Sequence, residues 1–221
     1  MNYSNAYSSI KKLMFGEVLG MVSIIVYFLN SFLASIIDYA FQYEKNNIVN
    51  SLLSVVAALT FISGITTIVS GIIQFIGLVK IRKLDKKFNE AIIMIVIIFI
   101  CTIIRDVVPD SLGSIISIIS EISDLWIAVA IIQGFVNITD DLNDYELSDE
   151  GLKVLKKAIT FLSIKIFCSI VFEYIISNPS FFIGIIILMS VITIIQIVAY
   201  IYYIRYLIHM KKYFGEKKEF C

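Results

Sequence analysis

The sequence predicts an all-α fold, a polytopic membrane bundle of six transmembrane helices that forms a single domain over residues 1–221. Hydrophobic residues make up 59% of the chain and the mean hydropathy is +0.91, whereas soluble domains are about 45–50% apolar. Six apolar stretches are each long enough to cross a bilayer, which takes roughly 20 residues per helix. The placement of Lys and Arg between these stretches then predicts an orientation.

The predicted spans pair into three antiparallel hairpins and cover residues 14–38, 52–79, 91–108, 112–137, 154–176 and 181–207. The first span is longer than the apolar region of a signal peptide, which has about 7–15 residues, so we expect it to be retained. The two prolines, Pro109 and Pro179, fall in short connections on one side of the bundle, where a missing N–H breaks no helix.

The basic residues lie almost entirely on the other side. All Lys and Arg residues except Lys45, Arg105 and Lys165 fall in the N-terminal segment, in the second-to-third and fourth-to-fifth connections, or in the C-terminal tail. By the positive-inside rule, both termini are expected in the cytoplasm. The formal net charge is zero, which gives no reason to expect nucleic acid as a partner; the expected partner is the lipid bilayer.

The fifth span carries charge near its middle. Lys165, Ser169 and Glu173 follow one another at four-residue spacing and therefore share one face of a helix. On the fourth span, Glu121 and Asp124 also share a face, and Asp124 lies within about one residue's rise of the depth of Lys165. An isolated charge at the bilayer centre costs about 2.5–3.5 kcal/mol on insertion scales. We therefore expect an ion pair between Lys165 and Asp124 or, failing that, Glu121.

The acids in the spans outnumber the bases. Glu121, Asp124 and Glu173 face Lys165, with Arg105 near the outer end of the third span. A carboxylate left unpaired in low dielectric must be protonated, hydrated or matched by a cation. Two interpretations are open: a site for protons, cations or a cationic ligand, or a structural polar network that determines which helices are neighbours.

The tripeptide Ile-Ile-Gln occurs in the second, fourth and sixth spans and ends at Gln74, Gln133 and Gln196. This pattern predicts a threefold repeat in which the three glutamines lie at similar depth and point into the bundle.

Other patterns predict packing and helix ends. Small residues at helical spacing predict a packing face on each of the first two spans, where another helix backbone can approach closely: Gly16, Gly20, Ser23, Tyr27, Asn30 and Ala34 on the first, Thr67, Ser70, Gln74 and Gly77 on the second. Four tyrosines near the inner end of the sixth span predict an interfacial aromatic belt: Tyr200, Tyr202, Tyr203 and Tyr206. Ser148 is expected to cap the fifth helix.

No motif points to catalysis. The chain lacks HExxH, GxSxG and Walker sequences, and its single histidine, His209, cannot build a histidine metal site. The three cysteines (Cys101, Cys168, Cys221) lack metal spacing. Lys165 and Ser169 have the spacing of a Ser–Lys dyad but no accompanying oxyanion feature. We expect a protein that is not an enzyme and that holds no metal and no cofactor.

The segment "GLVKIRKLDKKFNEA" resembles the point where one span ends and the next begins in six-helix bacterial integral membrane proteins of unknown function. The shared positions are Gly77, Ile81, Leu84, Asp85, Phe88 and Ala91. The resemblance implies a bacterial cytoplasmic membrane protein and supplies no activity.

Two function classes are consistent with these features. The first is a non-catalytic bundle that acts through helix–helix contacts with other membrane proteins or with itself, as an accessory, assembly or immunity-type factor. It is favoured by very short outer connections and many small-residue faces. The alternative is a transporter or solute-binding membrane subunit that uses the acid and lysine network of the fourth and fifth spans.

Overall fold

A computed structural model describes the backbone of residues 3–41, 47–105, 107–176 and 182–219, and within these ranges the regular structure is entirely helical. The six described helices are α1 (Tyr3–Phe41), α2 (Asn47–Ile81), α3 (Lys87–Arg105), α4 (Asp110–Asp141), α5 (Tyr145–Ile176) and α6 (Phe182–Glu219).

Five of the helices are long and apolar enough to cross a membrane: α1, α2, α3, α4 and α6. The exception is α5, because Lys156, Lys157 and Lys165 all fall in the most apolar part of its described side chains. The chain is therefore a helical membrane protein, and the crossing by α5 stays a prediction.

The helices run beyond the predicted spans. α1 begins at Tyr3, α5 begins at Tyr145 and α6 continues to Glu219, so each adds two or more turns outside the apolar stretch. α3 is shifted toward the N-terminus: it begins at Lys87, before the predicted span, and ends at Arg105, before the predicted end. Pro109 comes just before α4 and has an extended backbone (φ −60°, ψ 150°), which limits how far α3 can continue.

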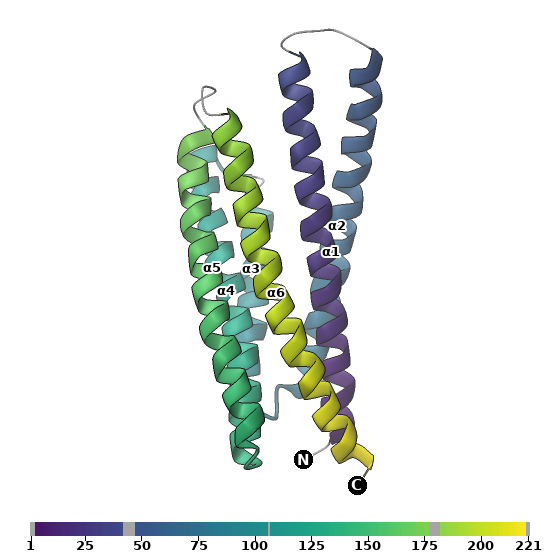
Figure 1. The fold of residues 1–221 in the computed structure, drawn as a ribbon, viewed down its shortest axis with the longest axis vertical. Coiled ribbons are helices and arrows are strands. Elements are labelled where there is room, and N and C mark those ends of the chain that lie inside the picture. The colour runs from purple at the N-terminus through teal and green to yellow at the C-terminus, as the bar shows by residue number, and fades with distance from the viewer. Residues whose placement is uncertain (1–2, 42–46, 106, 177–181, 220–221) are drawn as a thin grey trace.

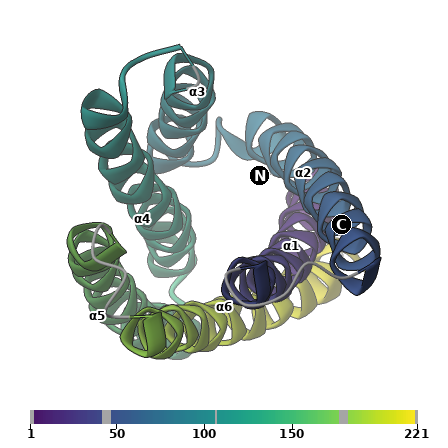
Figure 2. The same ribbon diagram turned by 90° about the horizontal axis from the view of Figure 1, so that it is seen from above.

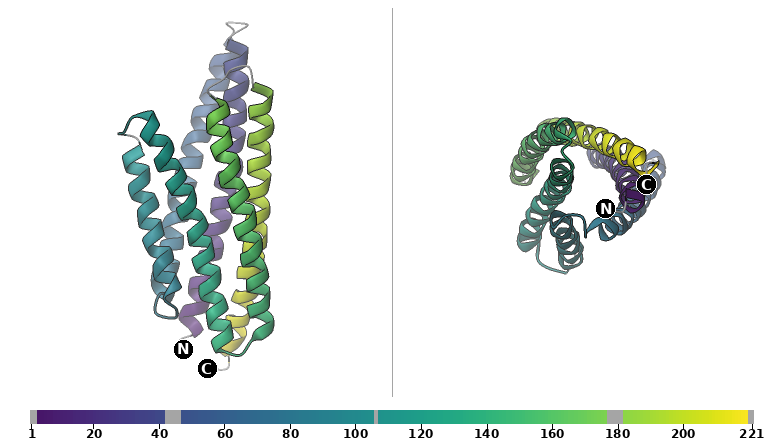
Figure 3. Two further views of the ribbon diagram at one scale, coloured as in Figure 1. Left: turned by 90° about the vertical axis from the view of Figure 1, so that its left-hand side faces the viewer. Right: turned by 90° about the horizontal axis from the view of Figure 1, so that it is seen from below.

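Each helix packs against the next along the chain, and α1 also packs against α6. Viewed from above, the helices form a ring in the order of the sequence (Figure 2). Both termini lie at the same end of the molecule (Figures 1 and 3). We call this the basic end, because it also holds the Lys- and Arg-rich connection between α2 and α3.

The hydrophobic core is concentrated at the basic end. All six helices contribute to one cluster of buried side chains there, and its largest members are fully buried: Ile10, Leu13, Leu78, Ile81, Phe88, Ile131, Ile132, Phe135, Tyr206, Leu207, Met210 and Phe214. The rings of Phe88 and Phe135 meet edge to face at 5.1 Å. Toward the opposite end, α1 and α2 diverge from α5 and α6 (Figure 1). The bundle is thus closed at one end and spread at the other.

Close packing holds α1 against α2, as the small residues predict. The Ser70 hydroxyl donates to the carbonyl oxygen of Gly16 at 2.7 Å. One turn or two further out, the Ser23 hydroxyl lies 2.6 Å from Thr67 Oγ1 and donates to the Ser63 carbonyl oxygen at 3.1 Å. Hydrogen bonds between small polar side chains, such as these, join helices whose other neighbours are apolar.

The turn between α4 and α5 corrects the predicted cap. Asn143 adopts a left-handed backbone (φ 57°), and the amide of Asp144 donates to the carbonyl of Thr139 at 2.9 Å, which closes α4. The Asp144 carboxylate then accepts from the amide of Leu147 at 3.1 Å and caps α5. Ser148 is not the cap: it lies inside α5 and is buried. The prediction placed the helix start too late because Asp144 itself supplies the capping oxygen.

Candidate functional site

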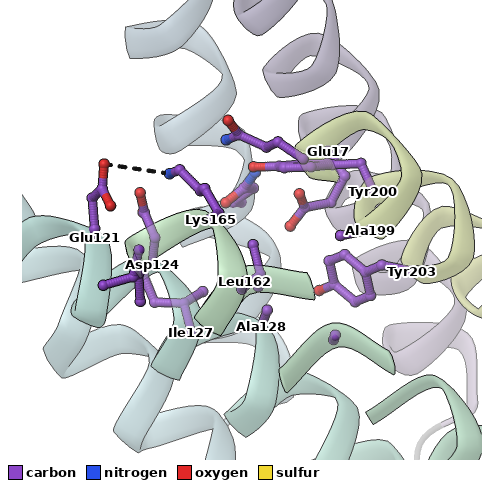
Figure 4. A pocket seen from close by; sticks show the side chains of 14 residues that line it. Glu17, Glu121, Asp124, Ile127, Ala128, Leu162, Lys165, Ala199, Tyr200 and Tyr203 are labelled. Carbon is purple, nitrogen blue, oxygen red and sulfur yellow. Dashed lines mark ion pairs between the residues drawn. The ribbon is translucent and has the colours of Figure 1, made fainter. Parts of the chain in front are cut away.

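A cavity of about 70 Å³ borders the hydrophobic core on the side that faces away from the basic end. Its polar lining comes from five helices: Glu17 on α1, Gln74 on α2, Glu121 and Asp124 on α4, Lys165 on α5, and Gln196, Tyr200 and Tyr203 on α6 (Figure 4). We call it the inner cavity. A water molecule needs roughly 10–15 Å³ of such space, so the inner cavity has room for several waters or one small ligand group.

A larger groove of about 580 Å³ leads away from it. This outer groove is lined by hydroxyl-bearing side chains, among them Ser23, Ser31, Ser63, Thr67, Ser169 and Thr193, and by the apolar Phe28, Met189 and Ile192. Glu121, Lys165 and Gln196 line both spaces. The two spaces therefore adjoin at these three side chains, with the inner cavity next to the core and the outer groove on the side of the spread end.

Lys165 pairs with Glu121. Its Nζ lies 3.9 Å from Oε1 of Glu121, and the two side chains are 11% and 23% exposed. Sequence reasoning named this acid as the second choice after Asp124; among the described side chains, Asp124 has no Lys or Arg partner within 4.0 Å. Asp124 is one turn further along α4, and its carboxyl group points toward the same ammonium group (Figure 4). Asp124 is solvent-accessible and lines the inner cavity.

Glu17, on α1, is a further acid of this site, and the charge pattern of the fourth and fifth spans did not predict it. It is only 4% exposed, lines the inner cavity from α1, and has no ion-pair partner within 4.0 Å among the described residues. It reaches the cavity because α1 packs against α6, which closes the ring of helices. With Glu121 and Asp124 it gives the inner cavity three carboxyl groups and one ammonium group, that of Lys165.

Two of the four tyrosines, Tyr200 and Tyr203, line the inner cavity, and a third, Tyr206, lies in the hydrophobic core. Tyr203 is 4% exposed and Tyr206 is fully buried, which corrects the predicted belt. The Tyr203 ring lines the inner cavity, and its buried hydroxyl lies near Glu17 without reaching hydrogen-bond geometry. Tyr200 lines the cavity beside it (Figure 4). The spacing of Tyr203, Tyr206, Met210 and Phe214 marks one helical face and could have predicted their burial.

The remaining predicted site residues lie apart from this cavity or at its margin. Ser169 lines the outer groove. Arg105 is the last residue of α3, is exposed and lines neither of these two spaces. The side chain of Glu173 lies outside the described residues.

The three glutamines do not share one environment. Gln74 and Gln196 both line the inner cavity. Gln133 lies between α3 and α4, where it donates to Asn137 at 3.0 Å, and Asn137 donates to Asp85 at 3.0 Å. Asp85 also accepts from the amide of Lys87 at the start of α3. Gln133 thus belongs to a polar chain that ties α4 to the α2–α3 connection, and the threefold repeat stays a prediction.

Within the described residues, no three His, Cys, Asp or Glu side chains converge as metal ligands. His209 instead pairs across the basic end with Glu150, Nδ1 to Oε2 at 2.8 Å. Comparison with protein-family models, with curated proteins and with solved structures finds no match to this chain.

Proposed function

We propose that the protein is a transporter, or the solute-binding membrane subunit of one, that takes a small cationic solute from the outer groove into the inner cavity. The proposal includes six crossings of a bacterial cytoplasmic membrane, with the basic end and both termini in the cytoplasm. It involves no catalytic chemistry and no cofactor.

The observation that supports transport is the adjacency of the two spaces. The outer groove lies toward the spread end and adjoins the inner cavity at Glu121, Lys165 and Gln196, and the inner cavity lies next to buried side chains of all six helices. A site part-way through a bundle, open to one side and closed to the other, is the arrangement that alternating access requires. A bundle that served only as a packing partner has no need of a charged dead-end cavity.

The charges of the cavity support a cationic solute. Three carboxyl groups (Glu17, Glu121, Asp124) face one ammonium group (Lys165). A bound cation would reduce the excess of negative charge, whereas a bound anion would add to it. Ionisable groups at membrane depth commonly mark ion or substrate pathways.

Transport is tested by flux into proteoliposomes loaded with a pH-sensitive dye and exposed to alkali cations, protons and methylammonium. We expect uptake of at least one of these by the wild-type protein and its loss in Asp124→Asn and Glu17→Gln. Glu90→Gln serves as the matched control, because Glu90 pairs with Lys87 on α3 and lines neither space. Equal flux in empty liposomes and in all variants would refute the proposal.

The accessory function is the second candidate, and one surface favours it. Ala57, Gly64 and Gly71 recur every seven residues on α2, and a Cβ built on either glycine meets no atom within 4 Å. This face would admit the backbone of a helix from another protein. If the accessory function is correct, Gly64→Leu should abolish co-purification of a membrane partner. If the protein is a transporter, the same substitution should leave cation flux unchanged.

A further inference from the structure

We propose that the ligand of the inner cavity is a primary alkylammonium ion, and that its ammonium head takes the place that the Lys165 ammonium occupies in the empty protein. The proposal rests on the transport function above and adds the class of solute and the role of the lysine.

The position of Lys165 is the first argument. Lys165 lines both the outer groove and the inner cavity, so a ligand that passes from the groove into the cavity encounters its ammonium group. The group is held by a single ion pair at 3.9 Å, and no hydrogen bond of 3.5 Å or less joins it to any described side chain. An ammonium group has three donors, so this one is loosely bound for a side chain that is only 11% exposed.

The unfilled acceptors are the second argument. Beyond Lys165, the cavity still offers the carboxyl groups of Asp124 and Glu17 and the buried, unpartnered hydroxyl of Tyr203. Oxygen acceptors and the ring faces of Tyr200 and Tyr203 are the groups that bind an ammonium ion, through charge-assisted hydrogen bonds and cation–π contacts. A divalent metal is a poorer match, because the acids do not converge as a ligand set in the described residues.

The sizes of the two spaces are the third argument. The inner cavity, about 70 Å³, accommodates an ammonium head with little beyond it. The adjoining outer groove is eightfold larger and carries Phe28, Met189 and Ile192 among its hydroxyl groups, which suits an attached hydrocarbon chain. The solute is therefore expected to be amphiphilic.

Lys165 then acts as a tethered competitor. Two ammonium groups within a few ångströms repel strongly in a protein interior, so ligand and lysine cannot both occupy the acids. Binding requires that the lysine side chain swings toward the outer groove, which it already lines. Removal of the lysine charge should therefore tighten ligand binding, the opposite of what removal of a structural or ligand-binding residue does.

The test is calorimetric titration of the detergent-solubilised protein with hexylammonium and with methylammonium. We expect hexylammonium to bind more tightly than methylammonium, and Lys165→Gln to bind hexylammonium at least tenfold more tightly than the wild type. Lys165→Arg, which keeps the charge, should show no gain. Lys156→Gln is the matched control, since Lys156 is an exposed lysine on the same helix that lines neither space.

If Lys165→Gln does not fold, the double variant Lys165→Gln with Glu121→Gln removes both charges of the pair and leaves Asp124 and Glu17 to bind the ligand. It should still bind more tightly than the wild type. Equal or weaker binding by the lysine variants, with the wild type still binding, would overturn the competitor role and leave the transport function standing. No binding of either ammonium ion to any of these proteins would overturn the alkylammonium ligand together with the competitor role, while cation flux into proteoliposomes decides the transport function separately.

Discussion

Replacement of Gly16 by alanine should weaken the contact between α1 and α2 and disturb the cavity at the same time. A Cβ built on Gly16 lies 2.6 Å from Cγ of Gln74 and 3.2 Å from the carbonyl oxygen of Ser70. The first contact is far inside van der Waals range, and the second is with backbone, which cannot move without the helix. Gln74 also lines the inner cavity, so its displacement reaches the site.

The magnitude follows from the two contacts. Overpacking a close interface typically costs about 1–3 kcal/mol. Because Gln74 is a flexible side chain that can rotate away, while the Ser70 carbonyl cannot, we expect a loss of about 1–2 kcal/mol in the free energy of unfolding. Gly71→Ala is the matched control on α2, since no atom lies within 4 Å of its Cβ position. Alanine there should be neutral or stabilise the helix by up to about 1 kcal/mol.

The measurement is reversible unfolding of the detergent-solubilised protein in SDS, followed by the fluorescence of its single tryptophan, Trp126, and by helical circular dichroism. Gly16→Ala should unfold at lower SDS than the wild type, and Gly71→Ala should not. Equal stability of the two alanine variants would show that α1 and α2 do not approach each other closely at Gly16.

Three further experiments test other parts of the bundle. Lys165→Met should destabilise the protein by roughly 1–3 kcal/mol because it strands Glu121, and adding Glu121→Gln should restore part of that loss; strictly additive values in this double-mutant cycle would show that the two side chains do not interact. Ser23→Ala removes hydroxyl contacts to α2 and should cost about 0.6 kcal/mol per bond in the same SDS titration, while an unchanged midpoint would contradict them. A cysteine at Glu146 should resist an impermeant thiol reagent applied to intact cells, whereas one at Asn47 should react; the reverse pattern would invert the proposed orientation.

Sequence patterns predicted the helices well because their signals are local. Apolar length identifies the spans, and the small residues around Gly16 and Ser70 mark a contact that the structure contains. The pairing of Lys165 was placed on the correct neighbouring helix, since consecutive antiparallel helices bring matched depths together. Which of two acids one turn apart it contacts depends on helix rotation, and hydropathy does not encode that rotation.

The rest of the site could not be predicted from local pattern. Glu17 joins the cavity only because the first helix packs against the last, and no short-range signal specifies which distant helices close a ring. Tyr203 was misassigned because tyrosines near a span end commonly lie at the interface. At the basic end α6 continues to Glu219, so Tyr203 and Tyr206 lie in the middle of a longer packed helix and not at its boundary.

The unequal lengths of α2 and α3 have a consequence for the surrounding lipid. The two helices start from the same connection, yet the span-like stretch of α2 has 30 residues and that of α3 has 19. At 1.5 Å per residue these are about 45 Å and about 28 Å, while a hydrocarbon layer is about 30 Å thick. The apolar surface of α3 is about as long as the hydrocarbon layer is thick. The apolar surfaces of α1 and α2 are longer, so these helices must tilt or the bilayer beside them must thicken. We therefore expect a thinner hydrocarbon layer beside α3 than beside α1 and α2, unless the longer helices tilt enough to remove the difference.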